Sequence, residues 1–350
     1  MRSSQGPESQ YALGTVCTVN LFEKGNLELY AKVFGRIHDL EDILSVTREG
    51  TDIDEVNKNA GIRPVKVRSE LIEVLEKALE YAEKSGGFFD PTIGPLVKLW
   101  GIGTDEARIP GEGEIREVQQ FIDYREIEIN REDETVFLKR PWMALDLGAI
   151  AKGYAADEAV KLLSLEGVER AIVDLGGNIF ALGARKIEKS PMETPIEVLM
   201  SALKSLLPDG KKNTDNEESF WRIGIQDPRE ERGSYIGVLN VKNKSVVTSG
   251  SYERYFVEGG KRYHHIFSIE SGCPVENGLL SVTIVADNSI DADALSTAVF
   301  ALGWERGKDL IETVNGAEGI FVFDDLSVRL TGNLEENFFL TAAEFRLAEK

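Results

Sequence analysis

Asp293 and Thr297 are the residues of this sequence whose chemistry and spacing are most informative. They stand four apart in the segment Asp291-Ala-Asp-Ala-Leu-Ser-Thr297, where an alternating β-branched stretch, 281–286, gives way to a helical pattern over 293–302. Residues four apart rise from one face of a helix. A carboxylate and a hydroxyl suit a hard cation, and the unpaired N–H groups of a helix start favour anions. The pair therefore indicates either a cation site that holds a phosphate or an ordinary helix cap against which Thr297 packs.

A second segment, Leu145-Asp-Leu-Gly-Ala-Ile-Ala-Lys-Gly-Tyr-Ala-Ala-Asp157, combines a short apolar strand end, a bend and a helix. Asp146 precedes the bend and Lys152 follows it by six residues. Gly148 permits a tight backbone that leaves a carbonyl near Ala149 pointing outward, and Lys152 could place its charge on a phosphate. The alternative is a glycine-started helix with an aspartate cap and a solvated lysine.

Two further segments could contact a ligand. The paired glycines of Asp174-Leu-Gly-Gly-Asn178 allow close approach of a ligand or another backbone, although a simple hairpin turn is their commoner use. Phe88 and Phe89, beside Asp90, could stack on and hydrogen-bond an aromatic heterocycle. Buried core positions are the commoner use of such rings.

Two of the three histidines, His264 and His265, are neighbours on an expected strand. Adjacent strand residues point to opposite faces, so the two do not form a bidentate metal site. We expect one to face a cleft and the other solvent. His265 is the better candidate for general acid–base chemistry or substrate orientation, the alternative being a histidine merely packed at a strand end. His38 lies in an ordinary amphipathic helix and is given no role.

The elements that would position these residues alternate between long helices and sequential, hairpin-like strands. This order favours an α+β fold with mostly antiparallel sheets over a doubly wound parallel sheet. Helices are predicted at 27–44, 69–85, 94–100 and 149–165, besides 293–302, with a helical turn at 54–57 and a loop at 104–117. Strands are predicted at 11–23, 127–129, 135–138, 170–174, 178–183, 220–225, 235–241, 245–248, 263–267, 279–286, 319–323 and 327–331.

Composition limits the class of function. The 350 residues carry a formal net charge of −20, which argues against a nucleic-acid partner. No apolar run is long enough to span a membrane. Cys17 and Cys273 show no metal or redox spacing, and whether they pair is left open. The motifs of P-loop, dinucleotide-binding and α/β-hydrolase sites are absent.

We expect one catalytic domain over 11–345. The polar start, residues 1–10, lacks an apolar signal core and is interpreted as a disordered remnant of a leader or of cloning. The tract 186–219 combines an amphipathic helical pattern at 196–207 with a polar, turn-rich stretch. Because it separates two expected strands, it is interpreted as a surface insertion.

In their order along the chain, these segments resemble the FAD:protein FMN transferase family, also called the ApbE or flavin transferase family. Each match is modest, but nine in one order are highly specific. The matching pieces are Leu13-Gly-Thr15, the turn Asp54–Asn57, Asp90–Gly101, Asp146–Tyr154, Asp174–Asn178, Trp221–Pro228, Thr248–Gly250, His265-Ile266 and Asp293–Thr297.

The resemblance implies a T-fold-related architecture and a magnesium-dependent enzyme of the periplasm or cell envelope, with a lipid anchor in the precursor. Such an enzyme cleaves FAD, releases AMP and attaches FMN to a threonine or serine of an acceptor protein of the redox-pump subunit type. By position the metal ligands would be Ala149, Asp293, Thr297 and, where some relatives carry a further acid, Ser296. The FAD contacts would be Leu13, Thr47, Phe88, Phe89, Asp90, Asp146, Lys152 and Ile266, and the catalytic residues His265 and Asp293.

Three departures from the family pattern are visible. Where the family continues after the histidine with an acidic Asp-Pro and a Thr-Gly, this chain has Phe267-Ser-Ile-Glu-Ser-Gly272. Thr47 replaces a tyrosine of some relatives, and 186–219 has no counterpart. Two alternatives to transfer stay open: a magnesium-dependent FAD pyrophosphatase that releases FMN and AMP, and a non-catalytic flavin-binding envelope protein.

Overall fold

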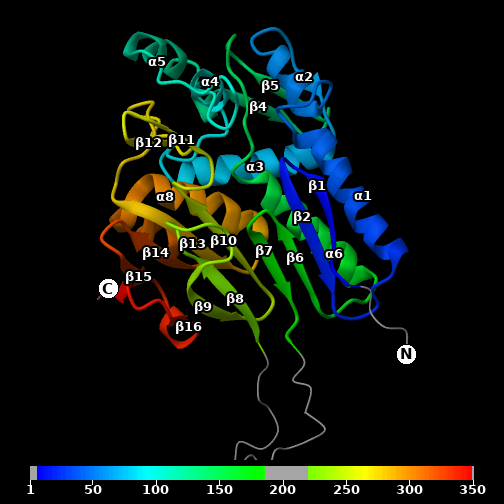
Figure 1. Ribbon diagram of the computed structural model, residues 1–350. Helices are drawn as coiled ribbons and strands as arrows, with labels where there is room; N and C mark the ends of the chain where they lie inside the picture. The colour runs from blue at the N-terminus through cyan, green and yellow to red at the C-terminus, as the bar shows by residue number, and fades with distance from the viewer. Residues whose placement is uncertain (1–5, 186–219, 349–350) are drawn as a thin grey trace, which may run out of the picture.

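The computed structural model describes residues 6–185 and 220–348 (Figure 1). The expected insertion at 186–219, with its helical pattern at 196–207, lies outside the described residues. Strand β1 (Glu8–Ala12) begins three residues before the expected domain boundary at residue 11.

A nine-stranded sheet forms the centre of the molecule, in the order β1-β2-β6-β7-β10-β13-β14-β15-β17. Every neighbouring pair is antiparallel except β15 and β17, which are parallel. After β1, its strands are β2 (Thr15–Leu21), β6 (Ala171–Leu175), β7 (Asn178–Leu182), β10 (Lys244–Gly250), β13 (Leu279–Ala286), β14 (Glu318–Phe323), β15 (Ser327–Leu330) and β17 (Arg346–Leu347). The predicted α+β class with mostly antiparallel sheets is confirmed.

Three long helices pack against one face of this sheet (Figure 1): α1 (Leu27–Leu44), α6 (Ala151–Leu165) and α8 (Ser289–Glu312). A fourth, α3 (Ser69–Lys84), packs against α1 and α8. Their apolar stripes and the facing strand residues form the main hydrophobic core. In α3, for example, Leu71, Val74, Leu75 and Ala78 recur at helical spacing and are fully buried.

The other face of the central sheet is covered by a second core. It is built with a three-stranded sheet of order β16-β9-β8, made of β8 (Trp221–Gln226), β9 (Tyr235–Val241) and β16 (Phe338–Leu340). The central sheet is therefore buried on both sides, which explains why β13 is apolar almost throughout rather than alternating.

Two smaller sheets lie at the periphery. The first has the order β3-β5-β4 and consists of β3 (Val65–Lys66), β4 (Ile127–Asn130) and β5 (Thr135–Leu138), near α2 (Asp52–Lys58). The second is the hairpin β11 (Tyr255–Glu258) and β12 (Lys261–His264), which packs against a satellite core with α4 (Gly94–Trp100) and α5 (Glu112–Gln119). Short 3-10 turns occur at Tyr124–Glu126 and Leu334–Glu336.

Several predicted boundaries were wrong. The single strand expected at 11–23 is the hairpin β1–β2, whose two-residue turn Leu13-Gly14 has φ of 52° and 71°. Such a turn suits a two-residue hairpin but is strained for leucine. The buried carboxylate of Glu41 accepts a 2.9 Å hydrogen bond from the Leu13 N–H and holds the turn in place.

Other differences affect the site more directly. The expected loop at 104–117 contains the start of α5. The strand expected at 263–267 ends at His264. Helix α8 begins at Ser289 rather than 293, and its backbone is non-helical at Gly303, where the predicted helix stops. Strands β3, β11, β16 and β17 were not predicted.

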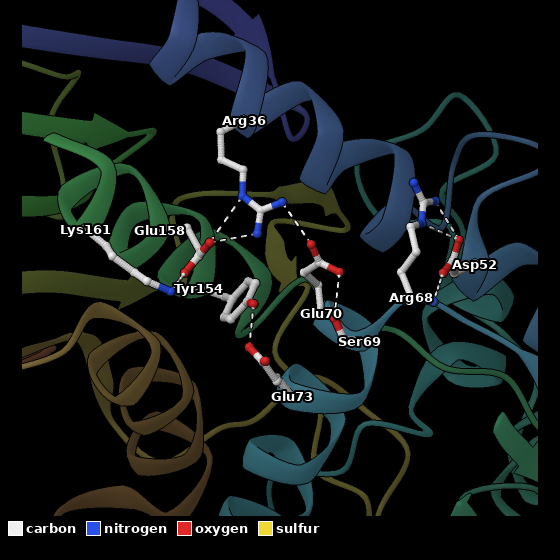
Figure 2. A network of polar contacts seen from close by, with 9 residues as sticks. All are labelled: Arg36, Asp52, Arg68, Ser69, Glu70, Glu73, Tyr154, Glu158 and Lys161. Carbon is white, nitrogen blue, oxygen red and sulfur yellow. Dashed lines mark hydrogen bonds and ion pairs between the residues drawn. The ribbon is translucent and has the colours of Figure 1, made fainter. Parts of the chain in front are cut away.

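A polar network fixes α6 to its neighbours (Figure 2). Arg36 on α1 donates to Glu158 on α6 at 2.7 Å and to Glu70 on α3 at 2.9 Å. The hydroxyl of Tyr154 on α6 donates to Glu73 on α3 at 2.7 Å. Three helices are thus joined by these side chains.

Cys17 is buried in β2 and Cys273 is half-buried, and both thiols are free. Among the residues that the structure describes, no helix is long and apolar enough to cross a membrane.

Candidate functional site

One cavity of about 350 Å³ brings together most of the residues singled out from the sequence. Its walls come from the β1–β2 turn, the loop before α4, the start of α6, the β6–β7 turn, the ends of β10 and β12, and α8. Of the predicted site residues it is lined by Phe88, Phe89, Asp90, Asp146, Ala149, Lys152, His265, Ile266, Asp293 and Thr297.

Asp293 is held from both sides. Its Oδ2 accepts a 2.8 Å hydrogen bond from the backbone N–H of Gly153 on α6, and its Oδ1 lies 3.6 Å from Lys152 Nζ. The residue is 3% exposed. Thr297, one turn later on α8, lines the same cavity, so the predicted sharing of one helix face is confirmed.

The bond to Asp293 also affects Ala149. In a regular helix the Gly153 N–H would bond to the carbonyl four residues earlier, that of Ala149. Because it donates to Asp293 instead, the Ala149 carbonyl is left without its helical partner at the cavity wall. A carboxylate, a hydroxyl and a free carbonyl are the oxygen donors that Mg²⁺ accepts, with water and phosphate completing its shell.

This donor set has one carboxylate, and within residues 6–185 and 220–348 no cluster of three or more His, Cys, Asp or Glu side chains could hold a metal. Ser296, the fourth predicted ligand, is not among the lining residues. Its hydroxyl is fully buried and donates to the Asp293 carbonyl at 2.9 Å. It also bonds to Ser249 Oγ at 2.8 Å, and Ser249 in turn lies 3.3 Å from Thr297 Oγ1. Ser249 does line the cavity and had not been singled out by itself.

The helix start is not where the sequence suggests. Helix α8 begins at Ser289, so Asp293 lies in its second turn. The N–H groups of Ser289 and Ile290 donate to the carboxylate of Asp157 on α6, at 2.7 and 2.9 Å. This cap comes from another helix, and it occupies the N–H groups that were expected to attract an anion. Burial raises the pKa of Asp157 to about 6, against the effect of these two hydrogen bonds and with help from Asp291 and Asp293.

Of the two neighbouring histidines, one faces the cavity as expected, but the other does not face solvent. His265 lines the cavity, whereas His264 is buried beside Phe300 rather than facing solvent. His264 Nε2 donates to the Val275 carbonyl at 2.9 Å and its Nδ1 accepts from the Ile266 N–H at 3.3 Å. Both nitrogens of its ring are therefore engaged by the backbone, and the residue has a structural role.

His265 Nδ1 lies 3.3 Å from the carbonyl of Arg254. A carbonyl only accepts, so Nδ1 carries the proton and Nε2 keeps its lone pair. Burial, together with the charge of Arg254, lowers the pKa of His265 to about 3. The ring is therefore neutral at physiological pH and can accept a proton or a hydrogen bond at Nε2.

Asp146 and Lys152 flank the bend that the sequence predicts. Asp146 Oδ1 accepts from the Gly148 N–H at 2.8 Å, and Lys152 Nζ donates to the Gly148 carbonyl at 2.9 Å. Burial raises the pKa of Asp146, which the hydrogen bond from Gly148 opposes. The bend is thus stabilised by the two residues that were expected to contact the ligand.

Phe88, Phe89 and Asp90 form one wall of the cavity. Phe89 is buried against Tyr81, and Phe88 lies with its ring 4.3 Å from the guanidinium of Arg306. Asp90 Oδ1 accepts from both the N–H and the hydroxyl of Thr92, at 2.8 and 2.6 Å. The aspartate therefore shapes the loop, while the partly exposed Phe88 offers a ring face to a planar ligand.

Leu13 and Thr47 are not among the lining residues. The cavity is lined instead by Gly14 and Thr15, which follow Leu13 in the β1–β2 hairpin. Thr47 is exposed in the loop after α1 and bonds only to Ser45 among the described residues.

The sequence analysis missed three charged residues of the cavity: Arg232, Glu253 and Arg254. Arg232 comes from the β8–β9 loop and donates to the Gly176 carbonyl at 3.2 Å. Glu253 and Arg254 follow β10, in the segment that was noted for its Thr248-Ser-Gly250 motif and the histidines beyond. The available signal was the positive charge of Arg232 and Arg254 in a chain of net −20, whereas an acidic residue such as Glu253 does not stand out in such a chain.

Known proteins resemble this chain over most of its length. The model of the ApbE family matches residues 13–321. The chain is 37% identical to the FAD:protein FMN transferase of Treponema pallidum, over 97% of this chain and 90% of that protein. It is 34% identical to a protein of the same name from Klebsiella pneumoniae, over 87% and 84%.

Solved structures show the same fold. The ApbE protein of Thermotoga maritima superposes with a TM-score of 0.74 at 29% identity, covering 91% of this chain and 94% of that chain. The flavinyl transferase ApbE of Pseudomonas stutzeri, in its apo form, gives 0.72 at 27% identity, covering 96% and 93%.

Proposed function

The chain belongs to the ApbE family, and on that premise we propose that it is an FAD:protein FMN transferase. It cleaves the diphosphate of FAD, releases AMP and joins FMN through a phosphoester to a threonine or serine hydroxyl of an acceptor protein. The observation that carries this proposal is the convergence of the Asp293, Thr297 and Ala149 oxygens with His265 in one cavity.

The donor set fits Mg²⁺, as argued above, and Asp293, Thr297 and the Ala149 carbonyl are the residues that would hold it. Bound there, Mg²⁺ would neutralise charge on the diphosphate and orient it for in-line attack. Ser296 supports two of these residues through hydrogen bonds. Its hydroxyl donates to the Asp293 carbonyl and bonds to Ser249, which in turn bonds to the hydroxyl of Thr297.

His265 is positioned to handle the proton of the acceptor. As the hydroxyl oxygen bonds to the FMN-side phosphorus, the bond from that phosphorus to the bridging oxygen breaks, and AMP leaves with the electron pair. The hydroxyl proton is taken up at His265 Nε2, the unprotonated ring nitrogen, whose pKa the negative charge of the bound diphosphate raises, and it passes to solvent. The Nδ1–H bond to the Arg254 carbonyl keeps the ring in this tautomer.

The cavity also suits a planar ring of FAD. Phe88 presents an aromatic face, and the apolar Ile266 and Val97 line the same space. Rings of this kind hold a planar heterocycle by stacking and burial. The acceptor is expected to be a protein of the redox-pump subunit type, whose hydroxyl must reach the FMN-side phosphorus.

The decisive test uses the whole protein with FAD, Mg²⁺ and an acceptor that carries a threonine, or the same acceptor with that threonine replaced by alanine. We expect AMP release together with an FMN-sized mass increase on the threonine acceptor only. AMP release with no labelled acceptor would establish the pyrophosphatase instead. Stoichiometric FAD that survives prolonged exposure to Mg²⁺ would establish a flavin-binding protein.

The proposed role of His265 is tested with His265→Asn. We expect transfer to fall by about 100-fold, within the usual range for loss of a general base, with FAD still bound. His38→Asn is the matched control, since His38 lies on α1 outside the cavity and bonds to Gln10. Equal transfer by His265→Asn and His38→Asn would exclude this role.

The family resemblance also supports a location in the periplasm or cell envelope, with a lipid anchor in the precursor. Fractionation of cells that express the full-length gene tests this proposal, and recovery of the protein in the cytoplasmic fraction would contradict it.

A further inference from the structure

The cavity needs positive charge to hold the diphosphate of FAD, and two expected sources are already engaged. The N-terminal N–H groups of α8 donate to Asp157. Lys152 donates to the Gly148 carbonyl at 2.9 Å, and its Nζ lies 3.6 Å from Asp293 Oδ1. The charge of Lys152 therefore already interacts with Asp293, the carboxylate that would also bind the metal.

Arg254 differs from these two sources in its contacts. It lines the cavity, yet its guanidinium makes no hydrogen bond or ion pair with any residue in 6–185 or 220–348. The backbone of the same residue is firmly held, because its carbonyl accepts from both the N–H and Nδ1 of His265, at 3.2 and 3.3 Å. A free cation is thus anchored next to the proposed proton acceptor.

At the wall of the cavity, the side chain of Arg254 lies along two glycines. A Cβ atom added to Gly14 would lie 3.6 Å from one guanidinium nitrogen, and one added to Gly103 would lie 3.7 Å from Cδ. The Arg254 side chain therefore runs alongside two residues that have no side chain of their own, and no Cβ atom from either covers it. The charge of Arg254 also reaches into the cavity, because it lowers the pKa of His265 and opposes the rise that burial causes at Asp146.

We propose that Arg254 is a catalytic residue that binds the FAD diphosphate and stabilises the negative charge on the departing AMP phosphate. The inference rests on the proposed function and adds a residue to its machinery. A guanidinium presents two parallel N–H donors that match phosphate oxygens, and charge-assisted bonds of this kind are strong. As the bond to the bridging oxygen breaks, the electron pair stays on the AMP oxygen, and Arg254 remains protonated throughout.

Arg254→Gln removes the charge and keeps a polar side chain of similar reach, while Arg254→Lys keeps the charge but loses the paired donors. The matched control is Arg262→Gln on the neighbouring β12. Arg262 lies outside this cavity, is exposed, and has its guanidinium carbon 4.4 Å from the centre of the Tyr255 ring.

The first measurement is flavin binding in EDTA, followed by flavin fluorescence. We expect Arg254→Gln to weaken FAD binding on the order of 10- to 100-fold and to leave binding of riboflavin, which has no phosphate, unchanged. Arg262→Gln should match the wild type for both. An unchanged FAD affinity in Arg254→Gln, or an equal loss for riboflavin, would overturn the proposal.

The second measurement is kcat/KM for AMP release with Mg²⁺. We expect kcat/KM to fall by about 100-fold or more in Arg254→Gln and by less in Arg254→Lys. In Arg262→Gln it should equal that of the wild type. An unchanged kcat/KM in Arg254→Gln would overturn the proposal even if FAD affinity in EDTA is too low to measure. If the wild type labels no acceptor, the proposed transfer fails, whereas the comparison of FAD and riboflavin still decides the role of Arg254.

Discussion

The backbone N–H of Gly153 donates a 2.8 Å hydrogen bond to Asp293 Oδ2, and this single contact joins the two segments that carry most of the site. It fixes the carboxylate on α8 and at the same time leaves the Ala149 carbonyl without its helical partner at the start of α6. The proposed metal site is therefore a consequence of how closely the two helices pack.

Replacing Asp293 by alanine should remove the charged ligand of this site. We expect Mg²⁺-dependent AMP release to fall by about 100-fold or more, since a bound metal supplies several kcal/mol to charge stabilisation. Adding EDTA to the wild type should have the same effect. Asp309→Ala is the control, because Asp309 is exposed on the same helix and outside the cavity. AMP release by Asp293→Ala that still rises with Mg²⁺ would refute the metal assignment.

Replacing Gly153 by alanine should separate the helices. The added Cβ would lie 2.4 Å from the Ser289 carbonyl oxygen and 2.7 Å from Ile290 Cα, both of them backbone atoms that cannot move aside cheaply. We expect a loss of about 1–3 kcal/mol in the free energy of unfolding, measured by urea denaturation.

Gly35→Ala on α1 is the control for this substitution. Its added Cβ would meet nothing within 4 Å, so alanine should stabilise the helix by roughly 0.5–1 kcal/mol. Similar effects of the two substitutions would show that the contact between α6 and α8 is not tight.

The sequence was informative where the chemistry is local. Spacing of four placed Asp293 and Thr297 on one helix face, and the glycine at 148 correctly marked a bend. It failed where a partner is distant along the chain: the cap of α8 comes from Asp157, 132 residues before Ser289, so the helix start was placed too late.

The turn at Leu13 and the free cation at Arg254 were missed for a related reason. Leucine is an unusual residue at positive φ, and the turn is held by Glu41, 28 residues away. Arg254 belongs to no phosphate-binding motif, and it became notable only because it lines the cavity and its guanidinium has no hydrogen bond or ion pair within the described part of the chain.

Replacing Arg36 by methionine should loosen the network of Figure 2. The substitution leaves Glu70 and Glu158, which are 21% and 17% exposed, without their shared partner. We expect a loss of roughly 1–3 kcal/mol, reduced from the fully buried case because water reaches both carboxylates. Arg116→Met is the control, since Arg116 is 74% exposed and pairs with Glu112 at 3.7 Å. Equal unfolding free energies for the two variants would contradict a clamping role for Arg36.

Asp157 should give the stability of the protein a distinct pH dependence. Its pKa is raised on folding from 3.8 to about 6, so the fold favours the protonated form. The stabilising contribution of this group is complete below about pH 4 and is lost as the pH rises through about 6. Asp157→Asn cannot titrate, so its unfolding free energy relative to wild type should rise by roughly 3 kcal/mol from pH 4 to pH 7, at about 1.4 kcal/mol per pKa unit. Urea denaturation of both proteins in metal-free buffer measures this difference, and a difference that stays constant over that range would show that folding does not raise the pKa of Asp157.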